Sequence, residues 1–184
     1  MYFMGNTNSG IEYYNQGKYK EALSYFLEAL ASNPESHINY HNVGLSYDML
    51  QEVQLASAFY YKALKLNPKY VRSINNLAII NYKRNNEEVF LSLIEDAKNA
   101  NPDDAEAYSL LGTYHKDKKD YEMAKLYYEK AAKLDPDFYY NYYNLGKLWL
   151  EIGDKTKAKE YLEKSFEINP QFELTQKELK LLEA

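Results

Sequence analysis

The prolines of this 184-residue chain recur at a fixed interval, and this interval constrains the fold more than any other feature. They are Pro34, Pro68, Pro102, Pro136 and Pro170, so every gap is 34 residues. Each follows an Asn or Asp, residue types that tolerate a left-handed backbone. Such a pair ends a helix, because proline disfavours helical backbone in the residue before it and has no N–H to continue one. Five helix ends in phase therefore indicate an internal repeat.

Small and bulky residues keep the same phase. The small residues stand 24 positions before each proline, at Gly10, Gly44, Ala78, Gly112 and Gly146. The bulky ones stand eight positions before it, at Phe26, Tyr60, Ile94, Tyr128 and Leu162. Apolar residues within each repeat follow a helical rather than an alternating spacing, and a short turn such as Gln16-Gly17-Lys18 separates two helices. Because a small residue facing a large one lets antiparallel helices pack closely, the pattern predicts stacked helical hairpins.

The second repeat carries Tyr40, Val43-Gly44, Tyr47, Ala56, Tyr60, Ala63 and Pro68 in an order that resembles the tetratricopeptide repeat. The resemblance implies an all-α fold, a right-handed α-solenoid of antiparallel helix pairs forming one continuous domain. We expect five repeats and a capping helix. Their limits are 3–36 (atypical), 37–70, 71–104 (divergent, with Asn81 and Phe90), 105–138 and 139–172, followed by the cap at 173–184.

Composition narrows the function classes. The formal charge is −5, which argues against a nucleic-acid partner or a polybasic membrane anchor. No stretch approaches the roughly 20 apolar residues of a membrane span, and the first residues lack a secretory signal pattern, so we predict a cytoplasmic protein without membrane insertion. The absence of cysteine excludes disulfides, thiol nucleophiles and Cys-ligated metals.

Residues for catalysis or metal binding are sparse. His37 and His41 are four apart and share one helix face, a spacing that could begin a metal site, but no third ligand can be named. The sequence has no Gly-rich phosphate loop and no nucleophile elbow. We therefore expect no enzyme activity, no cofactor and no metal, and a metal- or ligand-dependent enzyme built on the two histidines stays the weakest alternative.

The family resemblance implies that the first helix of each repeat lines a concave groove that holds a peptide from a partner protein. One lining column reads Asn8, Asn42, Asn76, Leu110 and Asn144, and an amide can pair with any peptide main chain because it both donates and accepts. The predicted groove residues are His41, Asn42, Arg72, Asn75, Asn76, Tyr82, Lys83, Lys116, Tyr143, Asn144 and Lys147. Their mixed charges, with nearby acids such as Asp48, predict a ligand with both signs or with apolar anchors rather than a strongly acidic one.

The sequence thus favours a non-catalytic scaffold that binds a protein or peptide. One class of such repeat domains binds the C-terminal carboxylate of a chaperone with a lysine at a fixed groove position. Here that position holds His41, Asn75 and Tyr143 in three of the repeats, which argues against membership of that class. The main alternative is a structural module that assembles weakly with itself through the ends of the solenoid, since stacked repeats expose their terminal faces unless capped.

Overall fold

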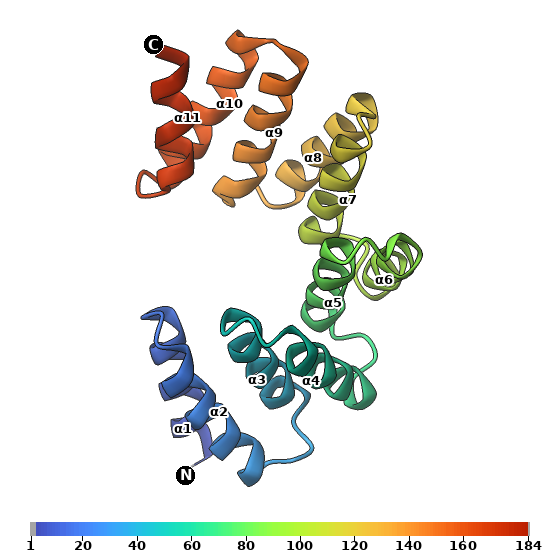
Figure 1. Ribbon diagram of the computed structural model, residues 1–184, viewed down its shortest axis with the longest axis vertical. Coiled ribbons are helices and arrows are strands. Elements are labelled where there is room, and N and C mark those ends of the chain that lie inside the picture. Colours follow the sequence, from blue (N-terminus) through green and yellow to red (C-terminus); the bar gives the residue numbers. More distant parts are fainter. Residues whose placement is uncertain (1–2, 184) are drawn as a thin grey trace. The chain divides into compact units, whose positions relative to one another are not determined.

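A computed structural model describes the backbone of residues 3–183 and the side chains of residues 6–182. This part of the chain contains eleven α-helices and no strand (Figure 1). The helices are α1 (Phe3–Asn15), α2 (Tyr19–Ser32), α3 (His37–Met49), α4 (Val53–Leu66), α5 (Val71–Lys83), α6 (Glu87–Ala100), α7 (Ala105–Asp117), α8 (Tyr121–Leu134), α9 (Tyr139–Ile152), α10 (Lys155–Ile168) and α11 (Glu173–Glu183). None of the described helices is both long and apolar enough to cross a bilayer.

The chain folds into two compact units, an N-terminal unit of Met1–Ala100 and a C-terminal unit of Asn101–Ala184. Successive helices pair into hairpins, and in each unit one hairpin packs on the next, α2 on α3 and α4 on α5, then α8 on α9 and α10 on α11. The predicted all-α solenoid of antiparallel helix pairs is confirmed. The repeat limits and the single continuous domain stay predictions, and Ala184 of the expected cap lies outside the described residues.

The predicted contact between small and bulky residues holds the hairpins together. A Cβ atom added to Gly44 would lie 2.7 Å from Cε1 of Tyr60, and one added to Gly146 would lie 2.6 Å from Cγ of Leu162. The bulky residue of this column is fully buried in every hairpin, with at most 2% of its surface exposed. The helices therefore approach so closely that the phase of the sequence fixes the register of each pair.

The turn between the two helices of a hairpin uses one left-handed residue. Gly17 and Gly153 have φ of 74° and 93°. The three remaining turns place Gln51, Asn85 and Lys119 in the same column, with φ between 58° and 65°. Glycine marks this position in two repeats only, because the turn geometry is imposed by the packed helices rather than by residue type.

The loops around the prolines differ in one respect from expectation. The residue before proline is not left-handed. Asn33 has φ −140° and ψ 83°, and Asn67 has φ −137° and ψ 92°, the extended region that proline imposes on its predecessor. The asparagine has another use, since the side-chain oxygen of Asn67 accepts a hydrogen bond from the N–H of Lys69 at 3.2 Å, across the proline. Asn101 and Asn169 form the same contact.

A column that sequence reasoning missed connects neighbouring hairpins. It contains Asn39, Ser73, Ala107, Asn141 and Thr175, all of them buried. Asn39 Nδ2 donates to the carbonyl of Ala29 at 3.0 Å, and Asn141 Nδ2 donates to that of Ala131 at 3.3 Å. These carbonyls lie in the last turn of the preceding helix, so Asn39 ties α3 to α2 and Asn141 ties α9 to α8.

Candidate partner-binding face

The predicted groove positions lie on the first helices of the hairpins. In the N-terminal unit these are α1, α3 and α5, and we call the surface formed by their groove columns the N-terminal first-helix face, marked by Asn8, Asn42 and Asn76. In the described structure none of these three side-chain amides forms a hydrogen bond with the protein. Asn42 is 8% exposed, Asn76 is half-buried and Asn8 is exposed. The face thus offers a row of amides whose donors and acceptors are not used internally.

Apolar and basic side chains flank this amide row. Ile11, Ile38 and Met49 are 43%, 45% and 41% exposed, although they are large apolar residues. A pocket of about 460 Å³ opens beside Ile38, between α1 and the start of α3. Arg72 and Lys83, one in the first and one in the last turn of α5, are exposed and form no ion pair in the described part of the chain. The N-terminal first-helix face therefore exposes large apolar side chains to solvent, together with amide and basic groups that form no hydrogen bond or ion pair within the described structure.

Two predicted groove residues of the same unit lie beneath the surface. Asn75 is fully buried, and His41 is 3% exposed. Nδ1 of His41 lies 3.0 Å from Oγ of Ser73, and its ring packs edge-on against Tyr70. Burial, with smaller effects of nearby Arg72 and His37, lowers the pKa of His41 to about 4, so the ring is neutral at pH 7.

The histidine pair is engaged in packing. Nε2 of His37 lies 3.3 Å from Nδ2 of Asn67, and its ring also packs against Tyr70. Among the described residues, no group of three His, Cys, Asp or Glu side chains is placed to hold a metal ion. The remaining predicted residue of this unit, Tyr82, is half-buried with its ring centre 5.1 Å from that of Phe90.

The groove residues of the C-terminal unit are bonded to one another across helices. Lys116 Nζ of α7 lies 3.2 Å from Oε1 of Glu151 in α9, and also 2.9 Å from Oδ1 of Asp117. Burial acts to lower the pKa of Lys116, but these two carboxylates outweigh it and raise the pKa, so the charge is retained. Lys147 of α9 lies 2.7 Å from Glu178 of α11.

The polar and aromatic groove positions of this unit are used in the same way. Nδ2 of Asn144 donates to Oγ of Ser109 at 3.2 Å, so this amide contacts the neighbouring first helix. Tyr143 is 9% exposed and lies beneath Phe172, with ring centres 5.2 Å apart. Tyr143, Asn144 and Lys147 therefore connect α9 to the segments packed beside it. Because these groups are already in contact with protein, fewer of them are available to a ligand than in the N-terminal unit.

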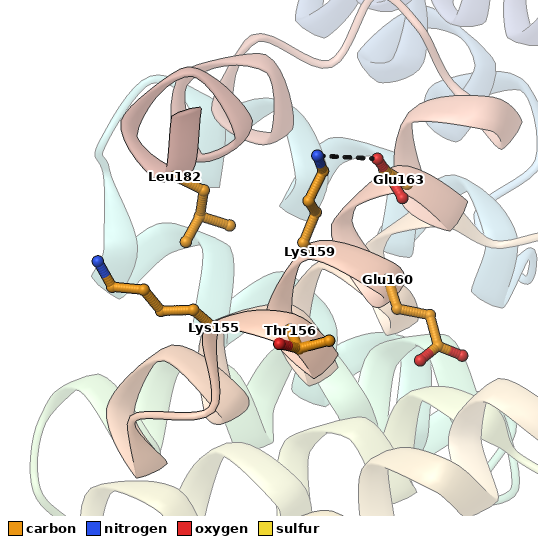
Figure 2. A pocket seen from close by; sticks show the side chains of 6 residues that line it. All are labelled: Lys155, Thr156, Lys159, Glu160, Glu163 and Leu182. Atoms are coloured by element: carbon orange, nitrogen blue, oxygen red, sulfur yellow. Dashed lines mark ion pairs between the residues drawn. The ribbon is translucent and has the colours of Figure 1, made fainter. Parts of the chain in front are cut away.

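A pocket of about 430 Å³ lies elsewhere in the C-terminal unit, between α10 and α11 (Figure 2). Leu182 of α11 faces Lys155 and Lys159 of α10, and Lys159 pairs with Glu163 at 3.7 Å. Two basic and two acidic side chains line this pocket, so its charges balance. It contains none of the predicted groove residues.

Comparisons with known proteins agree with the fold. Sequence profiles described as tetratricopeptide repeat match residues 7–71, 105–138 and 139–172. No curated protein sequence matches the chain. Among solved structures, TTC0263, a thermophilic TPR protein of Thermus thermophilus, is 20% identical with a TM-score of 0.86, and the match covers 98% of both chains.

Two further structures show the same fold at the same identity. PilF of Pseudomonas aeruginosa is 20% identical with a TM-score of 0.76, and the match covers 94% of this chain and 79% of that one. YrrB, described as a TPR protein with an unusual peptide-binding site, is 20% identical with a TM-score of 0.58, covering 95% and 90%. The matched profiles span well over half of the residues, and the hairpin packing follows the same repeat. The chain therefore belongs to the tetratricopeptide repeat family, which in general provides non-catalytic scaffolds for protein–protein interaction.

Proposed function

We propose that this protein binds an extended segment of a partner protein on the N-terminal first-helix face. The observation that carries the proposal is the row of Asn8, Asn42 and Asn76, whose amides make no hydrogen bond within the described structure. A carboxamide that donates and accepts can pair with a peptide main chain whatever the side chains of that peptide are. Exposed Ile11, Ile38 and Met49 would supply apolar contacts beside the row.

The contrast between the two units supports this choice of face. In the C-terminal unit the corresponding amide, Asn144, already donates to Ser109, and Lys116 and Lys147 already pair with carboxylates. A ligand there would have to replace existing bonds, whereas a ligand on the N-terminal unit would satisfy groups that have none. YrrB, described as a TPR protein with an unusual peptide-binding site, is an example of a protein of this fold that is described as having such a site. The role needs no cofactor and no chemical step.

The test uses the intact chain and a displayed library of random 12-residue peptides. Peptides selected for binding are synthesised with a fluorophore, and their affinity is measured by fluorescence anisotropy. The double variant Asn42→Ala/Asn76→Ala should weaken binding about tenfold, as the loss of two hydrogen bonds predicts. Thermal melting should change little, because neither amide is bonded within the fold.

Asn144→Ala is the matched control, since it removes the amide of the same column from the C-terminal unit. It should leave the peptide affinity unchanged. Equal affinities of the parent and the Asn42→Ala/Asn76→Ala variant would remove the argument from the amide row.

A further inference from the structure

A second pocket of the N-terminal unit combines an apolar floor with two basic side chains. It has a volume of about 440 Å³ and lies between the α3–α4 turn and the C-terminal end of α5. Met49, Val53 and Ile80 supply the apolar part, and Lys83 and Arg84 supply the charge. We call it the α3–α5 pocket. Sequence reasoning named Lys83 but missed Arg84, which follows the last residue of α5.

The charges of Lys83 and Arg84 are not neutralised by the fold. Neither side chain forms an ion pair with a described residue, and Asp48 is the one acidic side chain among the pocket's lining residues. The carbonyl oxygens at the end of α5 already accept backbone hydrogen bonds. Arg84 N–H bonds to Ile80 O at 3.2 Å, and Asn85 N–H to Tyr82 O at 2.9 Å. Lys83 and Arg84 are exposed, and against the single carboxylate of Asp48 they give the pocket a net positive charge.

The apolar part is equally available. Met49 is 41% exposed although it is a large apolar residue, and it lies in the groove column adjacent to that of Asp48. A small inorganic anion would use the two cations but leave Met49 and Val53 in water. An acidic side chain joined to an apolar one would use both halves of the pocket, which is the arrangement that charge complementarity and apolar burial favour together.

We infer that the α3–α5 pocket receives an Asp or Glu side chain lying next to an apolar residue in the partner segment. This inference rests on the proposed function, because the pocket shares Met49 and Lys83 with the N-terminal first-helix face. It departs from the expectation drawn from the sequence, which was a ligand with both signs or with apolar anchors rather than a strongly acidic one. Two basic side chains, Lys83 and Arg84, outnumber the single carboxylate of Asp48 in the pocket, so an acidic side chain next to an apolar one fits it best.

The peptide selection described above tests the inference. The selected peptides should be enriched in Asp or Glu adjacent to Leu, Ile, Phe or Met. The double variant Lys83→Ala/Arg84→Ala should bind the selected peptides about tenfold or more weakly than the parent. Added salt should weaken the binding of these peptides to the parent. Asp48→Asn should tighten binding by about twofold to threefold, because it removes the opposing negative charge.

The control Lys20→Ala/Lys65→Ala removes the same net charge from exposed positions of the second helices and should leave affinity within about twofold of the parent. If Lys83→Ala/Arg84→Ala leaves the affinity for the selected peptides unchanged while Asn42→Ala/Asn76→Ala weakens it, the inference is overturned and the proposed function stands. The reverse response would support the pocket and overturn the amide row. Failure to select any peptide would overturn both proposals. Competition by a 12-nucleotide oligouridylate at peptide-like affinity would overturn the inference, because it would assign the charges of the pocket to nucleic acid.

Discussion

A single methyl group added at Gly112 tests the packing that holds each hairpin together. The Cβ atom of Gly112→Ala would lie 2.6 Å from Cε1 and 2.8 Å from Cγ of Tyr128. Unstrained carbon atoms stay about 3.5–4.0 Å apart, so the ring must move by about 1 Å. Tyr128 has little freedom to do so. It is 1% exposed, and its hydroxyl donates to Oγ1 of Thr113 at 3.0 Å.

Two effects of opposite sign set the magnitude. Replacing glycine by alanine inside a helix favours the helix by about 1 kcal/mol. Overfilling a packed site costs about 1–3 kcal/mol, and straining the bond from Tyr128 to Thr113 adds up to about 1 kcal/mol. The upper part of the range applies, because the obstacle is a buried ring rather than a flexible chain end. We expect Gly112→Ala to lower the free energy of unfolding by about 1–3 kcal/mol.

The assay is urea denaturation followed by circular dichroism at 222 nm and by fluorescence of Trp149, which lies in the same unit. If the two unfolding curves coincide, a two-state free energy of unfolding can be calculated from them. This check is needed because repeat proteins do not always unfold in a single step. The third repeat provides the control background, because Ala78 and Ile94 are both buried there at the equivalent positions. In a Tyr128→Ile chain the added methyl group should cost nothing, giving a coupling of at least about 1 kcal/mol between the two sites.

Two outcomes would contradict this account of the packing. One is a gain of about 1 kcal/mol from Gly112→Ala, the response of an exposed helical glycine. The other is an equal cost of the added methyl group in the parent chain and in the Tyr128→Ile chain, which would show that the ring is not the obstacle.

Two further predictions concern pH and the turns. Burial lowers the pKa of His41 to about 4, below the 6.5 of the unfolded chain, so only the unfolded state gains a proton between these values. The free energy of unfolding should therefore fall by up to about 1.4 kcal/mol per pH unit below about pH 6.5, and His41→Gln should flatten that slope in urea titrations between about pH 6.5 and pH 5. Lys119→Gly should stabilise the protein by about 0.5–1 kcal/mol in thermal or urea unfolding, because Lys119 holds φ of 61°. The adjacent Lys118→Gly, at φ −80°, is its control, and an equal gain there would exclude backbone strain as the cause.

Much of the fold follows from local and periodic features of the sequence. The Asn-Pro pairs end helices for reasons confined to two residues. The pairing of Gly44 with Tyr60 involves residues 16 positions apart within one hairpin, so it repeats wherever the phase repeats. The capping carboxylate of Asp104, which accepts from Ala107 N–H at 3.0 Å, was predictable for the same reason. The left-handed position in the turn within each hairpin was only partly predictable, since Gln51 and Lys119 are not residue types that favour a left-handed backbone.

Which side chains of the candidate site are hydrogen-bonded or ion-paired could not be predicted in this way, because these bonds form between repeats. The sequence places Asn42 and Asn144 in one column, but Asn144 meets Ser109 of the preceding repeat, whereas Asn42 meets no such partner in the described structure. Lys147 is paired because Glu178 lies on α11, the helix that follows its hairpin, whereas Lys83 forms no ion pair with any described residue.

By itself, therefore, the sequence determined the helices, their pairing within each hairpin and the columns that we propose to face a partner. The tertiary structure decided which members of those columns are buried, which are hydrogen-bonded or ion-paired, and which form no such contact within the described structure. The physical reason is that a residue in a repeat array has its decisive neighbours about one repeat away, where the period fixes the position but not the identity of the contacting side chain.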